Sequence, residues 1–285
     1  MSQRVGILYQ PRVVRAVELN GELVRSLAQQ GVEAVSLSVW EEAEVAQRLA
    51  GCDLAVCLGG DGSLLRAARA AAVGGVPIAG VHLGRLGFMA ELEPDGLGKD
   101  VARLLAGEGW IEERMMLHVA LSDGSGERRN LQAMPPSVAF PALCLNDVFV
   151  GRGAVSRMVR VDVTVDGQAL GAFRCDGVLV ASPTGSTGYA LAAGGPVVHP
   201  QLEALVLESV AAHLSRIPAI VVPGSSRIGL CMETDHEAIL SLDGQMDVLI
   251  GSGTEVLVER SQYRARFLRL RPPSYFYTSL QARLG

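Results

Sequence analysis

The sequence predicts two domains of different class, an α/β domain over residues 1–112 and a mainly β domain over residues 113–265. In the first part, short apolar runs alternate with segments of helical spacing, which is typical of a parallel sheet with helical crossovers. In the second part, short β-rich runs are separated by turn signals. The chain has 285 residues, and at ~150 residues per domain this length also indicates two domains.

The α/β prediction rests on four apolar runs, each of which has the length of a strand. The segments between the runs carry apolar residues at helical spacing, and Gly31 is a stop signal for the first of them. The expected strands are 5–9, 34–39, 54–58 and 76–81, and the expected helices are 13–27, 41–49 and 63–72.

The β prediction rests on strand patterns at 159–165 and 255–257 and on hairpin-type turns. Turns are expected at 123–126, 166–167 and 243–244, where Asp-Gly pairs occur. The segment 200–214 fits either a helix face or a strand. Pro272 and Pro273 break the chain, and a tail from about residue 266 to residue 285 is expected to pack back on the first domain.

The composition excludes several classes of protein. Apolar residues make up 49% and charged residues 19%, which supports a sizeable core and excludes a disordered chain. The net charge of −5 argues against a nucleic-acid partner, because phosphate neutralisation needs clustered basic side chains. No apolar run approaches the ~18 residues of a membrane span, and the first ten residues are expected to form a strand rather than a signal peptide.

The cysteine, lysine and histidine patterns restrict the chemistry. Five cysteines without C-x-x-C spacing fit a reduced, cytoplasmic compartment better than disulfides or a zinc site. Lys99 is the only lysine and lies outside any Gly-Lys-Ser/Thr context, which excludes a Walker A loop. The histidines show no metal-ligand spacing, and His213 is interpreted as a core residue. No metal-binding residue is predicted.

The strongest local signal is Gly59-Gly60-Asp61-Gly62-Ser63, which follows an expected strand and opens an expected helix. Glycines let backbone N–H groups approach a phosphate, so Gly59, Gly60 and Ser63 are predicted to bind phosphate. Phosphate would repel the carboxylate of Asp61, so this residue is expected either to bind a metal ion or to accept a proton from an attacking hydroxyl. The structural alternative is that Asp61 or Ser63 caps the helix.

A second signal runs from Asp176 to Tyr189. A short expected strand leads into a loop with four hydroxyl residues, two glycines and a tyrosine. Hydroxyls and free N–H groups can bind ribose, amide or phosphate oxygens, and Tyr189 can stack on a base. The alternative is a polar turn between strands. The spacing is not that of a G-x-S-x-G hydrolase elbow.

Two shorter polar segments interrupt apolar patterns. Successive strand residues point to opposite faces, so at least one of Asn146 and Asp147 is expected to be buried and satisfied or to line a pocket. A structural bulge is the alternative. The segment Asp243-Gly244-Gln245 is interpreted as a hairpin turn.

Taken together, these segments resemble the NAD kinase family. Residues 59–66 resemble its GGDG[T/S]-x-L signature, and residues 80–88 resemble its G-[IV]-N-x-G-x-L-G-F stretch. The pair Asn146-Asp147 resembles an Asn-Glu pair, and residues 176–189 resemble D-G-x-x-x-x-T-P-T-G-S-T-A-Y, which residues 193–196 continue. Lipid kinases and phosphofructokinases also contain GGDG, so this motif alone does not indicate the family. The Pro-Thr-Gly-Ser-Thr loop, in this position after the other motifs, is specific for the NAD kinase pattern.

The resemblance implies a Rossmann-like first domain, a β-sandwich second domain and a homodimer or homotetramer whose NAD pocket takes residues from a neighbouring subunit. It implies phosphorylation of the 2′-hydroxyl of the adenosine ribose of NAD to give NADP, with ATP or polyphosphate as donor and a divalent cation such as Mg²⁺. By position, Asp61 would be the catalytic proton acceptor. The residues that would bind NAD are Asp61, Gly62, Phe88, Asn146, Asp147, Arg157, Arg174, Asp176, Thr187, Gly188, Tyr189, Ala190, Leu191, Ala192 and Gln245.

The chain departs from the family pattern at several positions, which concern the shape of the pocket rather than the type of reaction. Asp147 replaces the usual Glu and is one methylene shorter. Ser182 replaces the first Thr of the loop, Gly188 replaces the usual Ala, and His82 stands where Asn is usual. The surroundings of His213 are also altered.

Two other functions share parts of this pattern. A lipid kinase of the diacylglycerol or sphingosine type has GGDG and a β second domain, but the hydroxyl-rich loop and the lack of an obvious apolar membrane-docking face count against it. A non-catalytic NAD-binding sensor would use the same scaffold without turnover, and the intact Asp61 argues against it.

Overall fold

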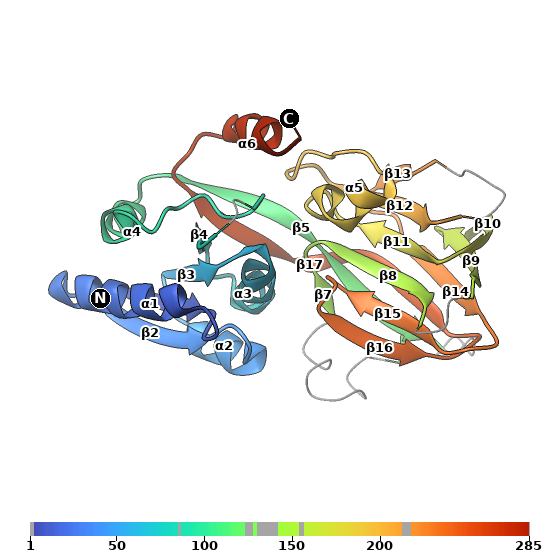
Figure 1. The fold of residues 1–285 in the computed structure, drawn as a ribbon, viewed down its shortest axis with the longest axis horizontal. Helices are drawn as coiled ribbons and strands as arrows, with labels where there is room; N and C mark the ends of the chain where they lie inside the picture. The colour runs from blue at the N-terminus through green and yellow to red at the C-terminus, as the bar shows by residue number, and fades with distance from the viewer. Residues whose placement is uncertain are drawn as a thin grey trace. The chain divides into compact units, whose positions relative to one another are not determined.

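The computed structural model describes residues 3–84, 87–122, 128–129, 142–153, 157–212 and 218–284 (Figure 1). It divides into two compact units. The first, called here the α/β unit, comprises Met1–Glu113 and Tyr263–Gly285, and the second, called the β unit, comprises Arg114–Gln262. The α/β unit combines helices with a parallel sheet, and the β unit consists mainly of antiparallel strands, so the predicted fold class is confirmed.

The α/β unit alternates strands and helices as the periodicity predicts. Its parallel strands have the order β2-β1-β3-β4, and the last residues of β17 (Glu255–Arg269) pair in parallel with β4. The other elements are β1 (Arg4–Tyr9), α1 (Val14–Gln29), β2 (Glu33–Ser38), α2 (Glu42–Leu49), β3 (Leu54–Gly59), α3 (Asp61–Gly74), β4 (Ile78–His82), α4 (Leu97–Leu105) and α6 (Tyr275–Leu284).

Helices cover both faces of this sheet. Val5 and Ile7 share one core with the apolar sides of α1 and α4. The intervening residue Gly6 points to the other face, where a Cβ would overlap Leu49 of α2. On β4, a Cβ at Gly80 would lie 2.6 Å from Leu64 of α3. α1 and α4 therefore cover one face, and α2 and α3 cover the other.

The chain leaves β1 and β3 toward opposite faces of the sheet, because α1 follows β1 and α3 follows β3. These two strands are neighbours, so the crossover direction changes between them. Open α/β sheets bind ligands at such a switch point, outside the carboxyl ends of the strands. The segment Gly60-Asp61 follows β3 directly and lies at this edge.

The β unit contains two sheets. The first has the order β13-β12-β11-β8-β15-β16, and the second has the order β10-β9-β14-β17, with β5 pairing β17, β6 and β7. The strands are β5 (Trp110–Ser122), β6 (Arg128–Arg129), β7 (Leu143–Cys144), β8 (Asp147–Arg152), β9 (Val159–Val165), β10 (Gln168–Cys175), β11 (Gly177–Ala181), β12 (Ala204–Val210), β13 (Ile220–Pro223), β14 (Ile228–Glu233), β15 (Ala238–Leu242) and β16 (Met246–Ile250).

The main core of the β unit is built from apolar side chains of both sheets, as in a sandwich. Val148 and Val178 from the first sheet share this core with Val161 and Leu230 from the second. The outer face of the first sheet is covered by α5 (Tyr189–Ala193), whose Ala190 packs on β11. The short helix η2 (Gly185–Thr187) precedes α5.

Within the ambiguous segment 200–214, residues Ala204–Val210 form strand β12 rather than a helix. The turns at Asp166-Gly167 and Asp243-Gly244 have positive φ at both residues, as hairpin turns of this type require. The expected turn at 123–126 and the residue His213 lie outside the described residues. All five cysteines are free thiols. Among the helices of the described ranges, none is long and apolar enough to cross a bilayer.

Candidate functional site

Asp61 is the first residue of α3, and its carboxylate does not cap that helix. Gly60 occupies the N-cap position, and no side chain makes a capping hydrogen bond. Oδ2 of Asp61 instead accepts a hydrogen bond from the backbone N–H of Phe88, at 2.8 Å. The structural alternative considered for Asp61, a helix cap, is therefore not what the structure shows.

The second oxygen of this carboxylate has a different environment. Oδ1 of Asp61 is buried and accepts no hydrogen bond from the described residues. Gly87 makes the arrangement possible, because a Cβ at that position would overlap the Asp61 carboxylate. A buried polar atom without a partner costs about 1–3 kcal/mol and is uncommon in native structures. Asp61 therefore holds one fixed oxygen and one oxygen that is able to accept a further hydrogen bond.

The glycines before Asp61 play two different parts. A Cβ at Gly59 would lie 2.6 Å from the side chain of Ser63, which is itself buried, so Gly59 is required by packing. A Cβ at Gly60 would meet no described atom within 4 Å. The backbone of Gly60 is thus the part of the segment that stands open to a ligand, while Ser63 supports the turn from inside.

Sequence reasoning missed Arg283, which lies on α6 beside Phe88. Its guanidinium carbon is 4.0 Å from the centroid of the Phe88 ring, and Nη1 donates a hydrogen bond to Ser279 Oγ at 2.8 Å. Burial lowers the pKa of the Arg283 guanidinium from its ordinary value, and the negative charge of Asp61 acts against this lowering. An arginine in a C-terminal helix carries no sequence signal that links it to a loop so far away in the chain.

In the β unit, Asp243 fixes the backbone of the Asn146-Asp147 pair. Its Oδ1 accepts hydrogen bonds from the N–H groups of Asn146 at 2.7 Å and Asp147 at 3.2 Å. Its Oδ2 accepts one from the N–H of Leu145 at 3.1 Å. Asp243 does form the expected hairpin turn with Gly244, but the turn pattern does not reveal this second role.

Asp147 is a buried carboxylate close to a second carboxylate. Burial, together with the negative charge of Asp243, raises the pKa of Asp147 to about 7. At neutral pH, both the protonated and the ionised form are therefore present. The carboxyl group can donate as well as accept a hydrogen bond, which suits it to a sugar hydroxyl.

The hydroxyl groups of the loop that follows β11 mainly stabilise the loop itself. Ser182 Oγ donates to the carbonyl of Leu145 and accepts from the N–H of Gly185. Ser186 Oγ accepts from the N–H of Val198 at 2.9 Å. Thr187 Oγ1 donates to the carbonyl of Thr184 at 3.1 Å. Backbone groups of the loop, together with those of Leu145 and Val198, thus account for these three hydroxyls.

Thr184 differs from the other three. Its Oγ1 is buried and has no hydrogen-bond partner among the described residues.

Two glycines bring this loop against the Asn146-Asp147 pair. A Cβ at Gly185 would overlap the backbone of Asn146. A Cβ at Gly188 would lie 3.6 Å from Asn146 Nδ2 and 3.9 Å from Asp147 Oδ2. Because Asn146 lies in a bend before β8, strand alternation does not separate the two side chains. Both reach the start of α5, which contains the predicted residues Tyr189, Ala190, Leu191 and Ala192.

Asp176 and Tyr189 belong to the same polar group. Asp176 lies in the bend between β10 and β11, and its Oδ1 is 3.0 Å from Nε of Arg152. The ring of Tyr189 is 5.7 Å from that of Phe149. Burial raises the pKa of the Tyr189 hydroxyl, and the negative charges of Asp176 and Asp147 raise it further. Gln245 lies in the same hairpin turn as Asp243.

Arg157 and Arg174 line an open cavity of about 540 Å³ in the β unit. Arg160 and His236 also line it, and Arg157 Nη1 lies 3.0 Å from His236 Nε2. Glu233 and Asp235 line it as well, so the cavity carries charges of both signs, with arginine as its most frequent charged residue.

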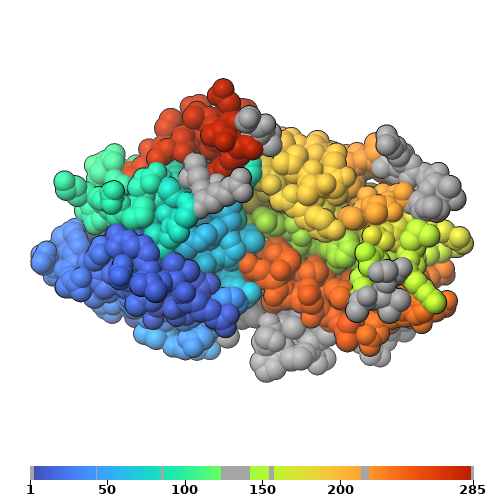
Figure 2. Space-filling view, viewed as in Figure 1, coloured from blue at the N-terminus to red at the C-terminus, as the bar shows by residue number. Residues whose placement is uncertain are grey.

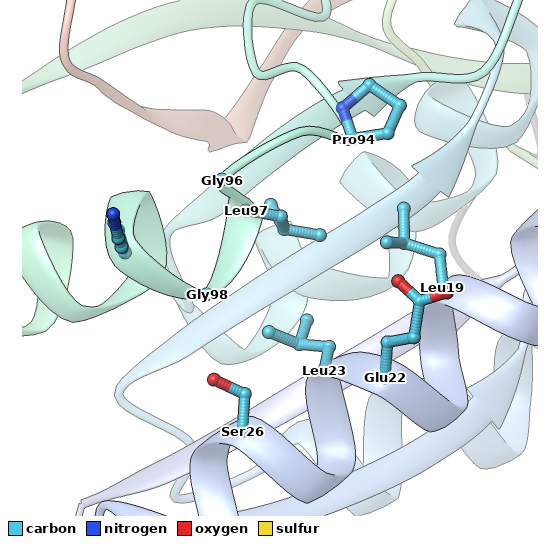
Figure 3. A pocket seen from close by; sticks show the side chains of 9 residues that line it. Leu19, Glu22, Leu23, Ser26, Pro94, Gly96, Leu97 and Gly98 are labelled. Carbon is cyan, nitrogen blue, oxygen red and sulfur yellow. The ribbon is translucent and has the colours of Figure 1, made fainter.

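A second hollow, of about 260 Å³, lies between α1 and the start of α4 (Figure 3). It is lined by Leu19, Glu22, Leu23, Ser26, Pro94, Gly96, Leu97, Gly98 and Lys99. None of the residues that the sequence singled out for phosphate or dinucleotide binding is among them. Within the described ranges, no three His, Cys, Asp or Glu side chains form a group suited to a metal ion.

Comparison with known proteins identifies the class of enzyme. Residues 10–109 match the family model of the ATP-NAD kinase N-terminal domain, and residues 145–270 match that of the ATP-NAD kinase C-terminal domain. These matches place the chain among the kinases, enzymes that transfer a phosphoryl group. The chain is 39% identical over 284 residues to an NAD kinase of Chloroflexus aurantiacus, with 100% of this chain and 99% of the relative covered. It is 36% identical over 285 residues to one of Dehalococcoides mccartyi, with 100% and 96% covered.

Solved structures share the fold. Yeast NADH kinase complexed with NADH superposes with a TM-score of 0.83 at 22% identity, covering 100% of this chain and 88% of that one. An NAD kinase from Archaeoglobus fulgidus in complex with ATP gives a TM-score of 0.77 at 27% identity, covering 98% and 99%. The family matches and the relatives together show that this chain belongs to the NAD kinase family.

Gly185 and Gly188 provide a matched pair of variants. Gly185→Ala should lower the free energy of unfolding by about 1–3 kcal/mol or more, because the added methyl overlaps the Asn146 backbone. Gly188→Ala should lower it by less than Gly185→Ala does, because the atom nearest to the added Cβ, the Gly185 carbonyl oxygen, lies at 3.2 Å and is not overlapped. Urea denaturation measures both. Equal losses in the two variants would contradict this account of the loop.

The raised pKa of Asp147 makes stability depend on pH. Between pH ~4 and ~7 the folded state keeps a proton that the unfolded state releases, so this stabilisation is present at low pH and is lost as the pH rises through about 7. Asp147→Asn stays neutral and should gain stability relative to the unchanged protein over this range, by up to roughly 4 kcal/mol. Denaturation at pH 5, 6, 7 and 8 tests this, with the exposed Asp235→Asn as control. A difference that does not vary with pH would refute the burial argument.

Proposed function

We propose that this chain phosphorylates the 2′-hydroxyl of the adenosine ribose of NAD and so forms NADP. The observation that carries the proposal is the asymmetry of the Asp61 carboxylate, whose Oδ2 is held by the N–H of Phe88 while Oδ1 is buried without a partner. An acceptor atom fixed in this way suits a hydroxyl that loses its proton during phosphoryl transfer.

Asp61 acts by orientation more than by prior deprotonation. A sugar hydroxyl is far less acidic than a carboxylic acid, so the carboxylate cannot remove its proton beforehand. In a loose phosphoryl transfer, the bond to the attacking oxygen forms late, and the proton passes to Asp61 Oδ1 at that stage. Oδ1 cannot rotate away, because the hydrogen bond from the Phe88 N–H to Oδ2 fixes the orientation of the carboxylate.

ATP or polyphosphate is proposed as the donor. ATP is supported by the 27% identical Archaeoglobus fulgidus relative, which was solved in complex with ATP. The described residues include no group of metal-ligating side chains, so a divalent cation such as Mg²⁺ is proposed to enter bound to the donor phosphates. In that position it supplies positive charge that offsets the charge of the transferred group. Gly59, Gly60 and Ser63 are proposed to form the phosphate-binding turn.

The β unit is proposed to bind the dinucleotide. Asn146, Asp147 and Tyr189 offer amide, carboxyl and aromatic groups in one place, and Asp176 lies close to Tyr189. Two departures from the family pattern meet here, because Asp147 is one methylene shorter than Glu and Gly188 lacks the methyl of Ala. A Cβ at Gly188 would lie 3.9 Å from Asp147 Oδ2. Both departures therefore enlarge the space between Gly188 and the Asp147 carboxyl group.

The two alternative functions receive no support from the comparisons. Both family models describe NAD kinase domains, and the relatives at 36–39% identity are NAD kinases over their full length. A lipid kinase would share with this chain only the glycine-rich segment and a β second domain. A non-catalytic sensor would share only the scaffold.

A homodimer or homotetramer is also proposed, with Arg157 and Arg174 serving the NAD pocket of a neighbouring subunit. Both arginines lie on the surface and line the same cavity. The charge reversals Arg157→Glu and Arg174→Glu should raise the KM for NAD at least about tenfold, because each removes a cation that pairs with the pyrophosphate. Steady-state kinetics measure this, and light scattering gives the number of subunits. A monomer with unchanged KM in both variants would contradict the proposal.

A cytoplasmic location is proposed as well, because none of the five cysteines forms a disulfide and a reducing compartment keeps thiols in that state. Fractionation of cells that express a tagged chain tests this, and recovery outside the cytoplasm would argue against it.

Asp61→Asn tests the function directly. Asn keeps an oxygen for the Phe88 N–H but accepts no proton, so NAD binding should persist while kcat falls by about 10²–10⁴-fold. Formation of NADP from NAD is followed with ATP and with polyphosphate, and formation of NADPH from NADH is followed beside it. Calorimetry measures NAD binding. A lipid acceptor serves as the negative control. Turnover near that of the unchanged chain in Asp61→Asn would refute the role of this carboxylate.

A further inference from the structure

We propose that Arg283 is a positioning residue for Asp61, holding the Phe88 N–H on the carboxylate by stacking on the Phe88 ring. The inference rests on the proposed function, because it concerns how the same acceptor atom is aligned. Arg283 acts on Asp61 through Phe88, because it stacks on the Phe88 ring while the Phe88 N–H holds Oδ2 of Asp61.

The segment Gly87–Leu92, between β4 and α4, is held from the C-terminal part of the chain at three points. Arg269 Nη1 donates to the carbonyl of Met89. Glu91 Oε1 accepts from the N–H of Leu270 at 2.6 Å. Arg283 lies over the Phe88 ring at 4.0 Å. Of these three contacts, the one made by Arg283 involves Phe88, the residue whose N–H bonds to Asp61.

The first point of attachment is built into the buried interior. Arg269 is buried and pairs with the buried Glu112 at 2.7 Å. Removing one partner of such a pair leaves an uncompensated charge and threatens the fold itself. Arg269 is therefore a structural residue, and its variants would not report on alignment alone.

Arg283 is placed differently, because it projects from the last turn of a surface helix. Figure 2 shows α6 at the surface of its unit, and Arg283 is only partly buried. The approach to α6 is fixed independently of Arg283, since Trp110 Nε1 donates to the backbone carbonyl of Arg271 at 2.7 Å. Loss of the Arg283 side chain should thus leave the helix in place.

The electrostatics agree with this arrangement. Asp61 lies close enough for its negative charge to stabilise the charged guanidinium of Arg283 against the effect of burial. An arginine is suited to the position because its planar group stacks on an aromatic ring and keeps its charge at all relevant pH values. A lysine would bring the charge without the planar stack.

The C-terminal part of the chain also supplies a matched control variant for Arg283→Ala. Arg271 makes the same type of arginine-on-ring contact in the same part of the chain, but with Tyr275 instead of Phe88. Arg283→Ala should lower kcat for NADP formation about 10- to 100-fold with little change in the KM for NAD or ATP, because misalignment of an acceptor affects turnover more than binding. Arg271→Ala should leave kcat unchanged.

Two further variants separate alignment from other roles. Arg283→Lys should recover part of the lost turnover, and so should millimolar guanidinium added to Arg283→Ala, whereas a structural defect would not respond to the added ion. In the Asp61→Asn background, Arg283→Ala should have little additional effect. If the two losses multiply instead, Arg283 acts independently of Asp61 and the inference is wrong.

Hydrogen exchange of the Phe88 amide provides a readout that needs no turnover. The rate should rise in Arg283→Ala and stay unchanged in Arg271→Ala, with thermal melting confirming that both variants fold. An unchanged Phe88 exchange rate in folded Arg283→Ala overturns the inference even if NADP forms. Conversely, failure of the unchanged chain to make NADP removes the proposed function while the exchange result still decides whether Arg283 holds Phe88.

Discussion

The hydrogen bond from the backbone N–H of Phe88 to Oδ2 of Asp61 is the constraint around which the α/β unit is arranged. It joins the first turn of α3 to the loop after β4, and it is possible because β3 and β4 are neighbouring parallel strands whose carboxyl ends meet at one edge. Gly87 has to lack a side chain for the two backbones to come this close. The bond also makes the two oxygens of one carboxylate unequal, and the chemistry proposed for Asp61 depends on that difference.

The general architecture could be predicted because it depends on local patterns. The apolar runs at 54–58 and 76–81 became β3 and β4 within a residue or two, and the Asp-Gly pairs at 166–167 and 243–244 formed hairpin turns. The segment 200–214 could not be decided, since its apolar spacing suits a helix as well as a strand. In the structure, pairing with β11 and β13 settles it as β12, with Leu205 and Leu207 in the main core.

The candidate site was only partly predictable, because several of its contacts join residues that are distant in sequence. The motifs located Asp61 and Asn146-Asp147, but not the three backbone N–H groups held by Asp243 or the guanidinium of Arg283 over Phe88. A dense set of hydroxyls suggested ligand contacts, yet Ser182, Ser186 and Thr187 bond to backbone groups of the chain itself, in the loop and in the segments packed against it. Composition cannot distinguish hydroxyls that build a binding loop from those that face its ligand.

The α/β unit is discontinuous, since it consists of the first 113 residues and the stretch from Tyr263 onward. During synthesis on the ribosome, β1 to β4 emerge first, the whole β unit follows, and the strand β17 that pairs with β4 arrives only afterwards. The edge of β4 therefore stays unpaired in the nascent sheet while more than a hundred residues are translated. A message cut short by a nonsense codon before β17 would yield a product that exposes this edge, and such open strands are templates for aggregation.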